Sequence, residues 1–82
     1  MKTKEEIIPH LNALIAEEFE IDEAIIQPEA SIFETLELDS ISLIDLVSLV
    51  RTNYGIRIPN EALPQIKTFN DLYDYVVGQQ TN

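Results

Sequence analysis

The chain of 82 residues contains no cysteine and no tryptophan, and it has a single histidine and two glycines. Without cysteine it has no disulfide, no thiolate metal site and no thiol nucleophile, so any thiol chemistry has to arrive on a cofactor. His10 alone cannot form the side-chain pairs of transition-metal and nucleophilic sites, and we place it on the solvated side of a helix. We therefore expect no enzymatic activity and no metal site.

Basic residues are also scarce, because five Lys and Arg stand against fifteen Asp and Glu, for a net charge of -10. Nucleic acids and anionic membranes bind basic surfaces, so neither is an expected partner. An acidic surface instead favours association with basic proteins. No apolar run approaches the ~20 residues of a membrane span, and the segment after Met1 lacks the apolar core of a signal peptide. We expect a monomeric, cytoplasmic protein.

Apolar residues at helical spacing predict a first helix from Thr3 to about Phe19, opened by the capping box Thr3–Glu6. Pro9 lies beyond the first turn and predicts a kink or a frayed first turn. Residues 20–39 lose the periodicity and form a long loop. Because this loop holds many apolar residues, we expect it to pack across the helices, with a helical turn near residues 31–35.

The most apolar segment, residues 40–53, predicts a second long helix, because its polar residues recur every third or fourth position. We expect four of its side chains in the core: Leu43, Ile44, Leu46 and Val50. Ile41 and Val47 are the candidates for exposed contact. An 82-residue domain cannot surround so apolar a helix completely, so part of it should face a ligand or partner.

The remaining sequence signals concern the part of the chain after the second long helix. Gly55 suits the left-handed residue after a helix, and Asn60 is expected to cap a short turn over residues 61–65. A second capping box, Thr68–Asp71, opens a last helix that ends near Gly78. The prediction is an all-α fold in one domain, residues 1–82, with three principal helices, one short helix and no strand.

Asp39 and Ser40 precede the second long helix, and the simplest explanation of such a pair is a helix N-cap. Four segments, however, resemble the acyl carrier proteins of fatty acid and polyketide synthesis in order and spacing, over about residues 3–77. They are Ala30-Ser31-Ile32-Phe33-Glu34-Thr35-Leu36, Asp39-Ser40-Ile41, Ile58-Pro59-Asn60 and Thr68-Phe69.

The resemblance implies an antiparallel four-helix bundle with 4′-phosphopantetheine esterified to Ser40. A magnesium-dependent phosphopantetheinyl transferase would transfer the group from coenzyme A and recognise the adjoining Asp39. The arm ends in a thiol that holds acyl groups as thioesters for acyl-loading and acyl-processing synthase enzymes. The expected partner-binding residues are Ile41, Asp45, Val47, Ser48 and Arg51. The expected acyl pocket is lined by Leu43, Val47, Ile58, Ala62 and Leu72.

Two departures from the family pattern bear on the type of carrier. Glu37 stands where the family usually has glycine, which tolerates backbone conformations that glutamate does not. Residues 51–53, Arg-Thr-Asn, occupy positions that are often glutamate in the family. We therefore expect a carrier of a specialised pathway. Two alternatives stay open: an aminoacyl or peptidyl carrier, for example of D-alanine, and an unmodified helical interaction module that binds through Ile41 and Val47.

Overall fold

The computed structural model describes residues 3–80, and for Ser40 and Ile41 it describes the backbone alone. Four α-helices and two short 3-10 helices follow one another along the chain. They are α1 Lys4–Phe19, η1 Glu23–Ile25, α2 Ile32–Leu36, α3 Ser40–Tyr54, η2 Leu63–Gln65 and α4 Phe69–Gln79. Residues 3–80 contain no strand, only an isolated bridge between Ser31 and Thr68. The all-α, four-helix prediction is confirmed.

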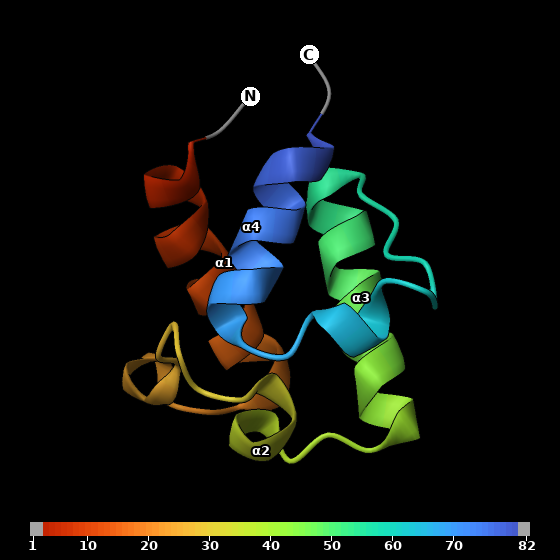
Figure 1. Cartoon of the computed structure of the whole chain (residues 1–82). Helices are drawn as coiled ribbons and strands as arrows, with labels where there is room; N and C mark the ends of the chain where they lie inside the picture. Colours follow the sequence, from red (N-terminus) through yellow and green to blue (C-terminus); the bar gives the residue numbers. More distant parts are fainter. Residues whose placement is uncertain (1–2, 81–82) are drawn as a thin grey trace.

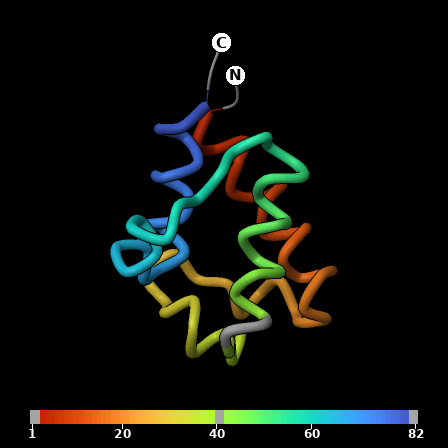
Figure 2. Tube along the Cα trace, turned by 90° about the vertical axis from the view of Figure 1, so that its right-hand side faces the viewer, coloured from red at the N-terminus to blue at the C-terminus, as the bar shows by residue number. Residues whose placement is uncertain are grey.

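The helices form a small bundle in which α1 runs antiparallel to α3 and α4 (Figure 1). The segment between α3 and α4 returns along the side of the bundle, so α4 begins near α2 at the lower end (Figure 2). Residues 20–39 also lie at this lower end, where they join α1 to α3. Among the described helices, none has the length and apolar character that crossing a membrane requires.

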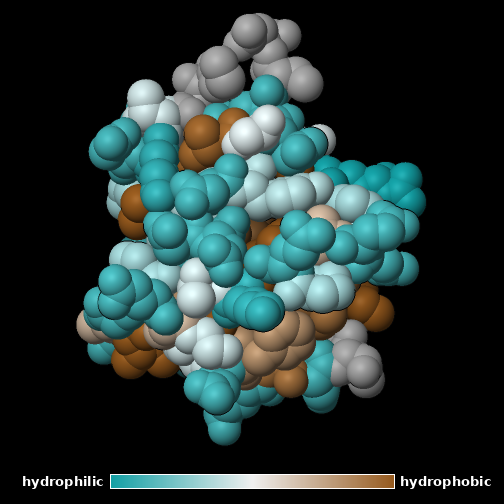
Figure 3. All heavy atoms as spheres, viewed as in Figure 1, coloured by the Kyte–Doolittle hydropathy of each residue, from teal (hydrophilic) through white to brown (hydrophobic). Residues whose placement is uncertain are grey.

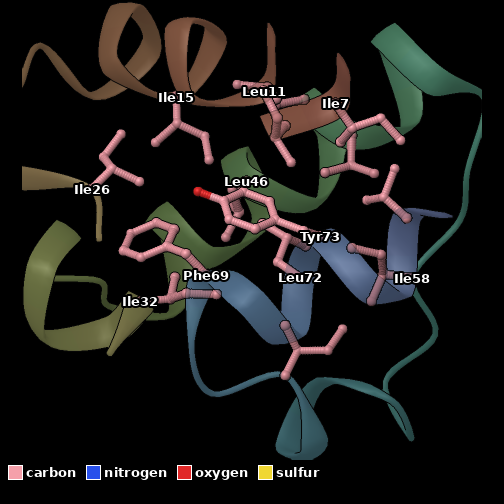
Figure 4. Packing of buried hydrophobic residues seen from close by; sticks show 14 of the residues in the cluster. Ile7, Leu11, Ile15, Ile26, Ile32, Leu46, Ile58, Phe69, Leu72 and Tyr73 are labelled. Atoms are coloured by element: carbon pink, nitrogen blue, oxygen red, sulfur yellow. The ribbon is translucent and has the colours of Figure 1, made fainter. Parts of the chain in front are cut away.

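One core lies between α1, α3 and α4, and Figure 4 shows side chains of all three helices pointing toward one another. Helix α1 contributes Ile7, Leu11 and Ile15, which are four residues apart and fully buried. Burying each such side chain contributes roughly 1.5–3 kcal/mol. The hydroxyl of Tyr73 on α4 donates a hydrogen bond to the Asn12 side chain on α1. This bond fixes the register between the two helices.

The start of α1 agrees with its sequence signal. Thr3 is the N-cap, and the Thr3 and Glu6 side chains each accept a hydrogen bond from the other's backbone N–H. Pro9 lies inside the helix, yet α1 is unbroken from its first residue. The expectation of a frayed first turn is therefore wrong, because the capping box satisfies the N–H groups of Thr3 and Glu6 and the N–H of Ile7 donates to the Thr3 carbonyl. The kink at Pro9 remains a prediction.

The long loop packs across the helices as expected and is more ordered than predicted. Asp22 caps the unpredicted η1, and the expected turn near residue 31 is α2, capped by Ser31. Hydrogen bonds join this region to the start of α4: the N–H of Ile32 donates to the Lys67 carbonyl at 2.9 Å, and that of Asn70 to the Pro28 carbonyl at 2.8 Å. Residues 28–32 and 67–70 are thereby tied together.

The link between α3 and α4 contains one confirmed and one wrong prediction. Gly55 has the expected left-handed conformation, with φ of 67°. Asn60 does not cap a helix, since η2 begins only at Leu63 and its N-cap residue is Ala62, without a side-chain hydrogen bond. The N–H of Ala62 instead donates to the Pro59 carbonyl. Asn60 therefore lies within this turn, and the helical residues begin only after it, at Leu63.

Candidate functional site

Asp39 caps α3. Its Oδ1 accepts a hydrogen bond from the Ser42 N–H at 2.8 Å, and its carbonyl accepts one from the Leu43 N–H at 3.0 Å. Asp39 thus fills the capping role that the sequence left open between residues 39 and 40. Ser40 is the first helical residue, and its side chain, like that of Ile41, lies outside the described part of the structure. Capping therefore gives no reason for a serine at position 40.

The start of α3 suits a phosphate ester electrostatically. A helix N-terminus carries unpaired N–H groups and a partial positive charge, which favour a nearby anion by roughly 0.3–1 kcal/mol. The first turn of α3 contains no acidic residue, and the one carboxylate at this helix end that is described above, that of Asp39, accepts the Ser42 N–H. A phosphodiester on residue 40 therefore fits the backbone and charges present here.

Glu37 ends α2 in the left-handed conformation, with φ of 51° and ψ of 47°. This geometry lets the N–H groups of Glu37 and Leu38 both donate to the Phe33 carbonyl, the second at 3.0 Å. Left-handed backbone costs a non-glycine residue roughly 1–2 kcal/mol. The position therefore has the geometry in which glycine is favoured, and this chain adopts it with a glutamate.

The residues expected to bind partners through α3 differ in exposure. Asp45, Ser48 and Arg51 are exposed, whereas Val47 is half-buried and packs against the core. Ile44, which was expected in the core, is 64% exposed, so that expectation is wrong. At 3.6 residues per turn Ile44 lies roughly 160° around the helix from the buried Leu46.

The other core expectations for α3 have a clearer outcome. Leu46 and Val50 are buried as predicted, at 4% and 0% exposure. Leu43 is half-buried. Leu46 and Val50 belong to the core cluster, whereas Leu43 is not among the residues that pack against it. Leu43 instead lines two apolar hollows beside α3.

Two apolar hollows adjoin one face of α3. The inner hollow, of about 10 Å³, lies between α2, α3, η2 and α4, and the outer hollow, of about 180 Å³, opens between α3 and η2. Leu43, Val47 and Ile58 of the expected acyl pocket line both, and Leu72 lines the inner one. Ala62 lines neither, and its neighbour Leu63 lines both. Phe33 and Leu63 were not among the residues expected to line the pocket, because apolar periodicity does not show which residues outside the long helices meet α3.

A third hollow, of about 490 Å³, lies elsewhere, between the end of α1 and the middle of α3. Four carboxylates line it: Glu17, Glu18, Glu20 and Asp45. No group of three or more potential ligands in the described part of the chain could hold a metal ion. This hollow is an acidic depression without a coordination site.

His10 is exposed on α1, as expected, and its Nδ1 lies 2.6 Å from the hydroxyl oxygen of Tyr54 at the end of α3. The two rings meet edge to face. Burial raises the pKa of the Tyr54 hydroxyl above its ordinary value, so the phenol stays protonated at neutral pH. The contact joins α1 to α3. In the described part of the chain, no acid or base that could serve catalysis is hydrogen-bonded to this pair.

The sequence of the chain is similar to those of several known proteins. A family model described as phosphopantetheine attachment site matches residues 10–76. The acyl carrier protein of Micrococcus luteus is 38% identical over 80 residues, which cover 98% of this chain and 99% of the relative. That of Myxococcus xanthus is 37% identical over 95% of this chain and 99% of its own length. The meromycolate extension acyl carrier protein of Mycolicibacterium smegmatis is 34% identical over 90% of this chain and 75% of its length.

Proposed function

The chain belongs to the acyl carrier protein family, and on this premise we propose that Ser40 is the residue to which its 4′-phosphopantetheine is attached. The protein is a carrier and not an enzyme, and it holds acyl intermediates in fatty acid or related biosynthesis. The arm, when attached, supplies the terminal thiol that a chain without cysteine lacks. One thiol without a competitor in the chain suits a thioester carrier.

The observation that carries the assignment is the start of α3. Ser40 lies within the matched residues 10–76, and Asp39 already caps the helix. Asp39 therefore fixes the backbone on which the residue to be modified is presented. In this proposal a magnesium-dependent phosphopantetheinyl transferase recognises Asp39 when it modifies Ser40.

Synthase and processing enzymes are the general partners of this family, and we propose that they contact the exposed stripe of α3. Asp45 and Ser48 lie on this stripe, and Arg51 replaces an acidic charge that the family often has there. The exchange supports a carrier for a specialised pathway, because partner enzymes with a strongly basic docking surface would be repelled locally. In this proposal the chain is a single, monomeric carrier domain in the cytoplasm.

The two apolar hollows are the proposed shelter for the acyl chain. The inner and outer hollows adjoin, because Leu43, Val47, Ile58 and Leu63 line both. Burial of an acyl chain there would be favourable by ~0.8 kcal/mol for each CH2 group. The inner volume of about 10 Å³ is roughly that of one probe sphere. The hollow therefore has to widen as an acyl chain enters.

The attachment is tested by incubating the protein with coenzyme A and a phosphopantetheinyl transferase. Mass spectrometry should find one added phosphopantetheine on the wild type, none on Ser40→Ala, and one on the matched control Ser42→Ala. A wild-type chain that stays unmodified with several transferases would contradict the proposal, as would modification of Ser40→Ala.

Loading assays separate the kinds of cargo. Acyl-transferring enzymes should load the modified protein, whereas loading only by adenylating enzymes would identify an aminoacyl carrier. The alternative of an unmodified interaction module is weakened because Val47, one of its two expected contacts, is half-buried. That alternative predicts a loss of function in Val47→Asp and none in Ser40→Ala.

A further inference from the structure

Phe33 on α2 has an unusual position for so large an apolar side chain. It lines the inner hollow, yet 43% of its surface is exposed. Its ring therefore has one side toward the hollow and another toward solvent. Figure 3 shows that apolar surface gathers at this lower end of the molecule, near α2, whereas the upper part is mostly hydrophilic. Phe33 closes the inner hollow at its α2 side.

Hydrogen bonds hold the α2 side of the hollow in place. At the first residue of the helix, the Ile32 N–H donates to the Lys67 carbonyl at 2.9 Å. After the helix, Glu37 and Leu38 both donate to the carbonyl of Phe33 itself. Moving the backbone of Phe33 outward would break bonds at both ends of a five-residue helix. The wall of the hollow that carries Phe33 is therefore fixed.

The opposite wall is held more loosely. In the described part of the chain, the backbone–backbone hydrogen bonds of residues 56–66 lie within that segment, such as Ala62 to Pro59 and Ile66 to Leu63. One side-chain bond, from the Tyr75 hydroxyl to the Arg57 carbonyl at 3.5 Å, joins the segment to α4. Leu63 is half-buried and lines both hollows. Rotation or displacement of this side chain joins the outer hollow of about 180 Å³ to the inner one. An entering chain then extends from the outer hollow toward α2.

We propose that Phe33 is a specificity-determining residue that sets the longest acyl chain the protein can bury. The inference rests on the proposed attachment at Ser40. An acyl chain enters through the outer hollow, displaces Leu63 and extends until its end meets the Phe33 ring. Longer chains leave their additional methylenes in solvent, because α2 cannot recede.

The test uses a series of acyl groups from butanoyl to hexadecanoyl, loaded onto Ser40 from acyl-coenzyme A by a phosphopantetheinyl transferase. The rate at which hydroxylamine cleaves the thioester reports how far the acyl chain is buried. Protection should rise about fourfold with each further buried methylene and stop rising at a limiting chain length. That limit should move to longer chains in Phe33→Ala and to shorter chains in Phe33→Trp.

Ile25→Ala is the matched control, because Ile25 is about as exposed as Phe33 but lines neither of the two apolar hollows. Its limiting chain length should equal that of the wild type. The same limit in all Phe33 variants would overturn the inference, and so would a wild type without protection at any chain length. Phe33→Trp keeps a large ring and gives the result even if Phe33→Ala fails to fold. Failure to load Ser40 would instead refute the attachment itself.

Discussion

Two glutamates carry the local backbone strain of this protein. Glu20 after α1 and Glu37 after α2 both have positive φ, at 54° and 51°. The sequence analysis identified Glu37 as a departure from the family glycine, and the structure shows why glycine suits the site. Glu20 gave no such signal, because only the packing of residues 20–39 decides how the chain leaves α1.

Replacing Glu37 by glycine should stabilise the protein by about 1 kcal/mol, because glycine adopts the left-handed conformation without steric cost. Glu34→Gly is the matched control, since Glu34 lies inside the same helix and should lose about 1 kcal/mol. Urea unfolding followed by circular dichroism measures both changes. Equal destabilisation by the two variants would show that the strain at residue 37 is negligible.

At the scale of the elements, the two capping boxes are the helix starts that could be predicted from the sequence. Thr3 begins α1, and Thr68 begins α4, each with the reciprocal bonds that its pattern predicts. These patterns are reliable because every contact lies within one helical turn. Asn60 failed as a cap because the turn at Pro59 closes on Ala62 first, and the choice between two turns depends on contacts with distant residues.

The capping box of α4 should make stability depend on pH. Hydrogen bonds from the backbone N–H of Thr68, and then of Lys67, hold the pKa of Asp71 below its ordinary value of 3.8. The folded protein therefore binds this proton less readily than the unfolded chain. The stabilisation is complete above the unfolded pKa near 3.8 and is lost as the pH falls through the lower folded pKa.

Urea midpoints measured against pH test this dependence. Below about pH 4 the wild type should lose stability more steeply than Asp71→Asn, which cannot titrate. Glu61→Gln removes an exposed carboxylate outside both boxes and should keep the wild-type slope. Parallel curves for wild type and Asp71→Asn would show that the negative charge of Asp71 does not stabilise the capping box.

At the scale of the whole molecule, the net charge of -10 opposes a compact state. Part of this charge is concentrated around the hollow between α1 and α3, where Glu17, Glu18, Glu20 and Asp45 converge. The sequence showed an acidic chain, but only the fold places Asp45 beside the end of α1. Repulsion between these groups is screened over about 10 Å at 0.1 M salt.

Added sodium or magnesium chloride should therefore raise the melting temperature by several degrees. The double variant Glu17→Gln/Glu18→Gln should depend less on salt than the wild type. Glu29→Gln/Glu61→Gln removes the same charge away from the hollow and is the control. Thermal melts insensitive to both salts would show that the carboxylates are too dispersed to matter.

The sequence by itself determined the three long helices α1, α3 and α4, the caps of α1 and α4, and the Asp39-Ser40 pair, because these depend on periodicity and on neighbours within a turn. Tertiary structure alone decided that Ile44 is exposed, that Leu63 takes the place expected for Ala62, and that Phe33 closes the inner hollow. Those outcomes depend on which helix faces meet across the core. The proposed attachment at Ser40 follows from local sequence, whereas the shape of the apolar hollows follows only from the fold.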